Sequence, residues 1–265
     1  MAKVLSKEEI HHFIKNGYHL AKGVFSRELA EKINSMVWEK LDEKPHDPST
    51  WNKPLVWLRE VFKNEIADQI HTKKYYNVID DLCGEDKWHA HTGAGVWPIL
   101  FPGFSKSWLV PEENWHIEGS WFHHHINSSE QGLVGIQLFT DIERGGGGTG
   151  VRLGSHHYTA QILAEAEPDG LDEHELCRRV IPLTKHLPVI EITGNAGDII
   201  FIHPFTLHGS STNTSNRVRI AANKCISLFE KLNIYRDNQD DYSIVELSII
   251  NSLNNKKLDI DLSSG

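Results

Sequence analysis

The sequence lacks the features on which membrane, nucleic-acid-binding and secreted proteins depend. No stretch approaches the roughly 20 apolar residues that cross a bilayer, and the amino terminus has no apolar signal core. No run of Lys or Arg forms a basic stripe, and 36 acidic against 27 basic residues leave a formal net charge of -9. We therefore expect neither a membrane nor a nucleic-acid partner.

Cysteine is also scarce, whereas histidine is abundant. Cys83, Cys177 and Cys225 are an odd number with wide spacing, which favours reduced thiols in a cytoplasmic protein over a disulfide framework. None of them forms a pair with the spacing of a zinc site. The 17 histidines supply the side chain that binds metals most often, so the composition points to metal binding.

The pattern of apolar residues changes character along the chain. Residues 1–92 are mostly helical in pattern, with a capping box at Ser6 to Glu9 and a second helix start at Ser26. Further helical patterns cover residues 56–62 and 66–82.

Residues 93–230 consist instead of short, strand-like runs separated by turn residues. The predicted strands are 96–101, 115–122, 133–142, 150–153, 188–192, 198–203 and 218–228. Many short strands with glycine-rich connections predict a mainly β fold with flanking helices and a jelly-roll, cupin-like core. We expect one domain over residues 1–265, in which residues 231–265 are a carboxyl-terminal extension.

Three side chains are candidate metal ligands. His116 and Glu118 lie in a predicted strand, whose alternation turns both to the same face, and His208 follows a second apolar strand. Two histidines and one carboxylate form the facial triad typical of non-heme iron(II), which leaves coordination sites open. The alternative is that all three are unrelated barrel and loop residues, and His203 is a rival to His208.

Two arginines follow His208 on one face of the next predicted strand, Arg217 and Arg219. A guanidinium can bind a carboxylate through two parallel hydrogen bonds, so either arginine suits a dicarboxylate co-substrate. Strand alternation does not separate the two. An exposed arginine pair on a barrel strand is the structural alternative.

These features together resemble the phytanoyl-CoA dioxygenase family. The resemblance extends over most of residues 5–228 and is carried by Ser6-Lys-Glu-Glu-Ile, Gly17-Tyr18, Trp115-His-Ile-Glu-Gly119, Gly154-Ser-His156, and the run from Gly197-Asp198 through His208-Gly-Ser to Arg219. It implies a double-stranded β-helix, iron bound by His116, Glu118 and His208, and a 2-oxoglutarate salt bridge from Arg219 rather than Arg217.

The resemblance also implies the reaction. An enzyme of this kind uses Fe(II), 2-oxoglutarate and O2 to oxidise, most simply to hydroxylate, a C–H bond of a small organic substrate, with release of succinate and CO2. Glu118 replaces the family's usual aspartate, and a carboxylate at this position disfavours a halogenase. Gln137 and Thr149 are further candidates for co-substrate binding, although each could instead fill the barrel.

Several features of the sequence leave alternatives open. A cupin-like dioxygenase or isomerase that does not use 2-oxoglutarate would share the ligands, and a non-enzymatic jelly-roll binding protein would share the fold. His123, His124 and His125 could shape a substrate pocket or form an exposed loop cluster. Apolar pocket walls could come from Trp97, Phe101, Trp115 and Trp121, for which core packing is the alternative.

Overall fold

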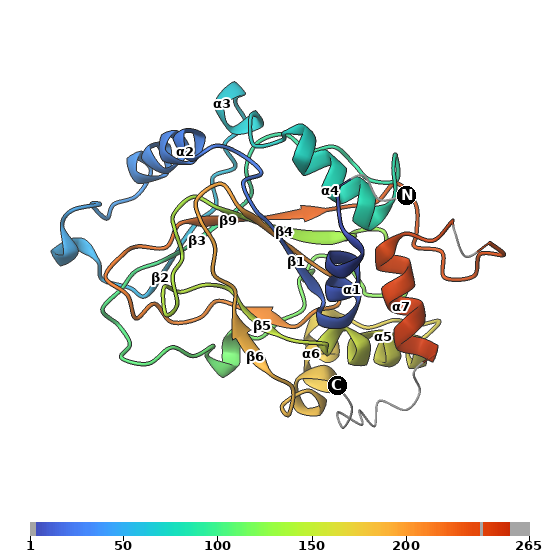
Figure 1. The fold of residues 1–265 in the computed structure, drawn as a ribbon. Helices are drawn as coiled ribbons and strands as arrows, with labels where there is room; N and C mark the ends of the chain where they lie inside the picture. The colour runs from blue at the N-terminus through green and yellow to red at the C-terminus, as the bar shows by residue number, and fades with distance from the viewer. Residues whose placement is uncertain (1–3, 239–240, 255–265) are drawn as a thin grey trace.

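The computed structural model describes residues 4–238 and 241–254, and its strands pair into three antiparallel sheets (Figure 1). The four-stranded sheet has the order β1-β7-β4-β9, the three-stranded sheet has the order β6-β5-β8, and β2 pairs with β3. The strands are β1 (Tyr18–Ala21), β2 (Leu55–Leu58), β3 (Trp97–Leu100), β4 (Leu133–Leu138), β5 (Gly150–Arg152), β6 (Val189–Glu191), β7 (Ile199–Ile202), β8 (His208–Gly209) and β9 (Ala221–Ile226).

Helices contain more of the described residues than strands do, so the fold is mixed rather than mainly β. The helices are α1 (Lys7–Asn16), α2 (Arg27–Glu39), α3 (Glu65–Asp68), α4 (Lys73–Cys83), α5 (Ser155–Glu165), α6 (Glu173–Leu183) and α7 (Ile244–Asn254), with short 3-10 turns η1 (Pro48–Thr50) and η2 (Glu112–Asn114). The expectation of a mainly β fold was wrong because the strands are short, and because α5 and α6 add helices where none was predicted.

Local signals explain where the helices begin. Ser6 accepts from the backbone N–H of Glu9 while the Glu9 carboxylate accepts from the N–H of Ser6, which confirms the predicted capping box. Ser26 caps α2 through its side chain alone, which accepts from the backbone N–H of Leu29. The helix predicted over residues 56–62 was wrong: Val56 pairs with Ile99, so strand pairing outweighs the weak local preference of this short run.

The four-stranded sheet separates two apolar cores. Its inner face, which includes Ile136 and Ala221, packs with Val151 of the three-stranded sheet. Its outer face, which includes Phe201, packs with residues of α2 and α4, and Figure 1 shows both helices on that side of β4 and β9. The region between the four-stranded and three-stranded sheets is therefore the place for an internal site.

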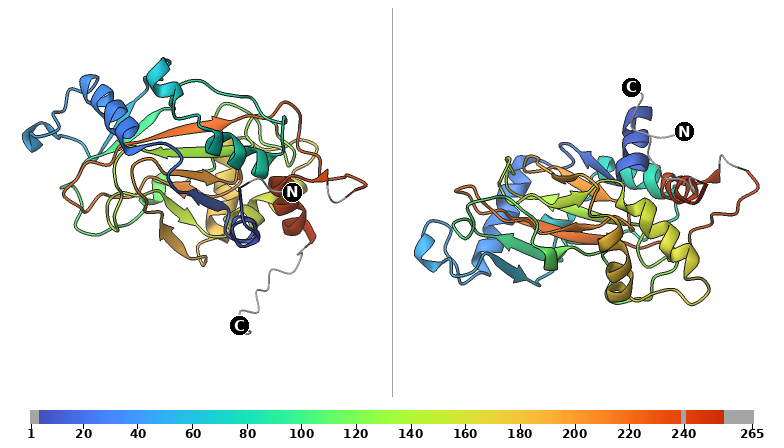
Figure 2. Two further views of the ribbon diagram at one scale, coloured as in Figure 1. Left: turned by 45° about the horizontal axis from the view of Figure 1, so that its top comes forward. Right: turned by 90° about the horizontal axis from the view of Figure 1, so that it is seen from below.

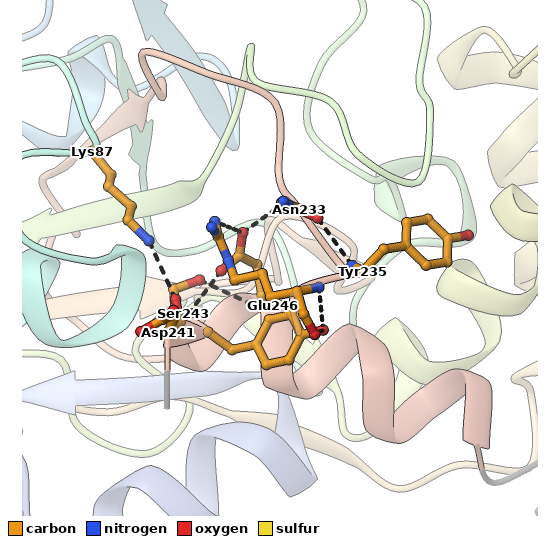
Figure 3. Close-up of polar contacts among 8 residues, drawn as sticks. Lys87, Asn233, Tyr235, Asp241, Ser243 and Glu246 are labelled. Carbon is orange, nitrogen blue, oxygen red and sulfur yellow. Dashed lines mark hydrogen bonds and ion pairs between the residues drawn. The ribbon is translucent and has the colours of Figure 1, made fainter. Parts of the chain in front are cut away.

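Helices α1, α5 and α7 gather at one end of the molecule, away from β2 and β3 (Figure 2). The start of α7 is fixed by the buried carboxylate of Glu246, which accepts hydrogen bonds from the backbone N–H groups of Ser243 and Asn233 (Figure 3). The guanidinium of Arg236 also donates to it. Because its acceptors are satisfied inside the protein, Glu246 holds the preceding segment against the body of the domain.

The three cysteines are free, as predicted, and Cys83 and Cys177 are buried. No helix in residues 4–238 and 241–254 is long and apolar enough to cross a membrane.

Candidate metal centre

His116, Glu118 and His208 converge on one point between the sheets. The backbones of His116 and His208 exchange two hydrogen bonds, of 3.0 and 3.1 Å, which places the two imidazoles side by side. Glu118 Oε2 lies 3.7 Å from His116 Nε2 and 3.9 Å from His208 Nε2, and the three ligand atoms lie within 4.8 Å of one another. Adjacent ligands of one metal ion lie roughly 3 Å apart, so binding would draw these atoms slightly together.

Backbone carbonyls orient both imidazoles. His116 Nδ1 lies 2.8 Å from the carbonyl oxygen of Asn114, and His208 Nδ1 lies 3.0 Å from that of Thr206. Each Nδ1–H donates to its carbonyl, which leaves the lone pair of Nε2 directed at the shared point. This is the arrangement by which proteins fix the tautomer of a metal-binding histidine.

The segment that carries Glu118 is not the regular strand predicted over residues 115–122, because only His116 forms a β-bridge there. The chain turns at Gly119, whose φ of 127° suits glycine alone. Gln131 donates to the Glu118 carbonyl at 3.2 Å, and His124 Nε2 lies 3.0 Å from the Gly119 carbonyl. The strand prediction was wrong beyond His116, yet the turn still presents Glu118 to both imidazoles.

For His208 and Glu118, the electrostatics favour the protonation states that metals require. Burial opposes protonation of His116, but its contact with Glu118 outweighs burial and raises the pKa of His116, so a metal ion competes with a proton there. Burial and, to a smaller extent, the neighbouring His116 lower the pKa of His208 to about 4. Burial opposes ionisation of Glu118, but its hydrogen bond with His116 and the charges of both imidazoles outweigh burial and lower its pKa. At neutral pH the centre therefore offers a neutral His208 and an ionised carboxylate.

Arg219 lies on the wall of the same region and is only 3% exposed. Its Nη1 donates to the Pro98 carbonyl at 2.7 Å, and its Nη2 donates to Thr149 Oγ1 at 3.2 Å. No carboxylate within the described part of the chain lies within ion-pair distance of it, and burial lowers its pKa to about 10. Arg217 is exposed in a bend before the strand and pairs with Glu143 at 3.6 Å. Only one of the two arginines therefore reaches the interior.

Gln137 lies on the other face of the four-stranded sheet. It pairs in register with Ala222 and Ile199, both of which belong to the outer core beneath the helices, whereas its neighbour Ile136 faces inward. Alternation along β4 therefore turns Gln137 away from Arg219. The expectation that it faces the pocket is corrected, while Thr149 contacts Arg219 as the expectation required.

Two adjoining cavities open between the triad and Arg219. They share Trp57, His116, Ser210 and Asn223. The inner cavity, of about 20 Å³, is lined by these four and by Pro98, Ile136, Thr149, His208, Gly209 and Arg219. The outer cavity, of about 330 Å³, is lined by the same four and by Leu55, Val96, Glu113, Asn114, Ile117, Glu118, Gly119, Ser120 and Glu173.

Unsatisfied polar atoms around these cavities show what the site can accept. Three atoms are buried and have no hydrogen-bond partner among the residues that the structure describes: His208 Nε2, Arg219 Nε and Asn223 Oδ1. Buried polar groups are normally paired, so such orphaned atoms point to a missing ligand. An ion at the triad would satisfy His208, and an anion beside Arg219 would satisfy its free N–H. Two nitrogens and one carboxylate oxygen are the donor set of non-heme iron.

The remaining histidine candidates lie outside the triad. His203 is buried beside His156, with ring centroids 4.9 Å apart, so it is not the third ligand. In the run His123 to His125, only His124 is buried, and it supports the Gly119 carbonyl. His125 lies 3.3 Å from Glu167. The run therefore steadies the turn after Glu118 and lines neither cavity.

The aromatic residues suggested as pocket walls do not line the cavities either. Trp97, Phe101 and Trp115 are buried in the core, and Trp121 is exposed. Trp57 takes this place instead, because β2 pairs with β3 and sets Trp57 opposite Pro98. Sequence patterns missed it because residues 56–62 read as helix. The sequence could have identified Asn223 as a cavity residue, because strand alternation places it on the same face as Ala221 and Arg219.

Comparison with known proteins agrees with this architecture. The carbocyclase SnoK from nogalamycin biosynthesis is similar with a TM-score of 0.53 at 18% identity, covering 86% of this chain and 85% of that one. HygX from Streptomyces hygroscopicus, solved with nickel and 2-oxoglutarate, has a TM-score of 0.54 at 13% identity, with 84% and 87% covered. EctD from S. alaskensis has a TM-score of 0.53 at 17% identity, with 84% and 77% covered. At these identities the likeness concerns the fold alone.

The sequence comparison is more specific. None of the curated proteins compared with the chain matches it. The model of the phytanoyl-CoA dioxygenase family matches residues 3–221, which include the triad and Arg219. The chain belongs to the phytanoyl-CoA dioxygenase family.

Proposed function

We propose that the protein is an iron(II)- and 2-oxoglutarate-dependent dioxygenase that hydroxylates a C–H bond of a small organic substrate. The balanced reaction takes substrate, 2-oxoglutarate and O2 to hydroxylated product, succinate and CO2. One observation carries the proposal: adjoining cavities are lined by a His-Glu-His triad and by a buried guanidinium that has no counterion within residues 4–238 and 241–254. A metal-only chemistry would leave the charge of Arg219 unexplained.

In this proposal, different residues bind the metal and the co-substrate. His116, Glu118 and His208 would hold the ion and leave three of its six positions for co-substrate and oxygen. Arg219 and Thr149 would bind the far carboxylate of 2-oxoglutarate, since a guanidinium matches a carboxylate with two parallel hydrogen bonds. The inner cavity has room for about one water, so a five-carbon diacid would extend from it into the outer cavity.

When bound, the iron supplies the oxygen chemistry that cleaves an unactivated C–H bond. The chain's own contribution is orientation and exclusion of water. The buried His208 and Arg219 fix the two ends of the co-substrate, and the apolar side chains of Ile136 and Trp57 cover it. The substrate would then occupy the outer cavity, where Glu118 forms part of the wall.

Comparison with solved relatives supports the cofactor assignment. One HygX structure holds nickel and 2-oxoglutarate, and one EctD structure holds 2-oxoglutarate and 5-hydroxyectoine. We further propose that the two larger sheets form a jelly-roll core and that the chain is a single domain. The inner core shared by the two sheets and the shared site between them favour both ideas.

Anaerobic reconstitution tests the function. We expect one Fe(II) per chain and 2-oxoglutarate binding that depends on it, followed by succinate release when O2 is admitted. His208→Ala should lose bound iron, while His203→Gln, which changes a buried histidine outside the triad, should retain it. Iron-dependent oxidation without any need for 2-oxoglutarate would favour a cupin-like dioxygenase, and absence of bound iron would favour a binding protein.

A further inference from the structure

The outer cavity has a one-sided distribution of charge. Its described wall contains three carboxylates, Glu113, Glu118 and Glu173, and neither Lys nor Arg. No Lys or Arg within the described residues lies within ion-pair distance of Glu113 or Glu173, whereas the adjacent Glu112 pairs with Lys185 at 3.2 Å. A carboxylate left without a cation on a cavity wall favours a positively charged occupant.

The metal centre loaded with 2-oxoglutarate has no net positive charge that would balance Glu113 and Glu173. Iron(II) and Arg219 contribute three positive charges, and Glu118 and dianionic 2-oxoglutarate contribute three negative charges. The centre is then neutral, so Glu113 and Glu173 have no cationic partner among the described residues, and the side-chain hydrogen bond of Glu173 comes from the thiol of Cys177, 3.5 Å from its Oε1. Glu173 lies in the first turn of α6, where a carboxylate favours the helix, but that does not explain Glu113 on η2 facing the same cavity.

Two uncharged groups on the same wall point to the same kind of ligand. Trp57 is 50% exposed, and its indole lines both cavities. An indole face attracts ammonium groups through its quadrupole. Asn223 Oδ1 is a buried acceptor without a donor, and it is satisfied by a ligand that carries N–H or O–H groups. Carboxylates, an indole and an orphaned amide oxygen all accept from, or attract, a protonated amine.

We propose that the substrate is a small amine-bearing cation, whose ammonium group binds between Glu113 and Glu173 against Trp57. This rests on the proposed function, because it places the C–H bond to be oxidised beside the triad. A cavity of about 330 Å³ suits a molecule at the small end of the range that such pockets bind. The family's namesake substrate class, an acyl-CoA, carries anionic phosphates that these carboxylates repel.

The test uses the full-length protein loaded anaerobically with Fe(II) and 2-oxoglutarate. Calorimetry measures the binding of small molecules in matched sets that share a scaffold and differ in charge, such as glucosamine, N-acetylglucosamine and glucuronate, together with linear amines and their alcohol and acid counterparts. We expect the binders to be cations. Preference for neutral or anionic members, or no binding of any cation at millimolar concentration, overturns the proposal.

Variants then locate the ammonium site. The double variant Glu113→Gln and Glu173→Gln should weaken the best cation about 10- to 100-fold, the effect of losing hydrogen bonds to charged groups, and leave its neutral analogue unchanged. Glu112→Gln is the matched control, since Glu112 is adjacent and exposed but lines neither cavity. Equal losses for cation and neutral analogue overturn the assignment.

The two proposals fail separately. If the wild-type protein binds neither iron nor 2-oxoglutarate, the proposed function falls. If it binds both and prefers uncharged ligands, only the substrate class falls.

Discussion

Replacement of Arg219 by Met tests the co-substrate site directly. Met occupies similar volume but removes the guanidinium, which has no other carboxylate partner among the described residues. Loss of two charge-assisted hydrogen bonds to the far carboxylate should cost about 3 kcal/mol, or roughly 150-fold in affinity for 2-oxoglutarate. Arg217→Met is the control, because Arg217 is exposed and pairs with Glu143.

Thermal unfolding of the anaerobic iron-loaded protein measures this loss. At 2-oxoglutarate equal to 100 times the wild-type Kd, binding should stabilise the wild type by about 2.7 kcal/mol, but Arg219→Met by only about 0.3 kcal/mol. For a chain of this length the increments correspond to Tm shifts of about 5 °C and below about 1 °C. Each variant is compared with its own sample lacking 2-oxoglutarate, so changes in intrinsic stability cancel.

The opposite pattern would refute the reasoning. If Arg219→Met kept the full increment and Arg217→Met lost it, the buried guanidinium would be a structural group and not the co-substrate anchor.

Three further predictions concern stability, each measured by urea unfolding. Burial lowers the pKa of His203 to about 3, so below about pH 6.5 the unfolded chain binds a proton at His203 that the folded chain does not bind. The free energy of unfolding should therefore be unaffected by this group above that pH and about 2 kcal/mol lower at pH 5. His203→Gln should remove this part of the pH dependence. Gly17 has φ of 82°, and an added Cβ would lie 2.3 Å from Thr206 Oγ1, so Gly17→Ala should destabilise by more than about 1 kcal/mol, whereas Gly23→Ala, with open space around it, should cost less. Glu246→Ala would remove the acceptor of three hydrogen bonds, one of them from the buried N–H of Ser243, and should cost about 3 kcal/mol; a loss below about 1 kcal/mol would show that these contacts are replaced by water.

Local patterns in the sequence predicted those elements whose stability is itself local. The capping box at Ser6 and the cap at Ser26 are satisfied within one turn, so the structure contains both. Short apolar runs bounded by turns also located most strands of the two larger sheets. Residues 56–62 failed because a run this short fits either a helix or a strand, and only pairing with β3 decides between them.

Site residues, too, were placed correctly where local geometry decides their position and wrongly where distant segments decide it. Alternation predicted that His116 and Glu118 share a face; the structure does bring them together, but through the turn that follows, because the chain leaves strand geometry directly after His116. Alternation misplaced Gln137, because it gives two faces without saying which one is internal. That choice depends on whether the helices or the three-stranded sheet cover a given face, and it is made by segments far away in the chain.

By itself the sequence predicted the candidate ligands, their order and the family, since these depend on side-chain chemistry and spacing along one chain. Only the tertiary structure decided that Arg219 is buried with no counterion in the part of the chain that the structure describes, while Arg217 is exposed. It also decided that Trp57, Glu113 and Glu173 share a wall with the triad. Both the pairing of charges and the lining of a cavity depend on residues that are distant in sequence. No local pattern can contain them, because they exist only when the sheets and their connections have packed.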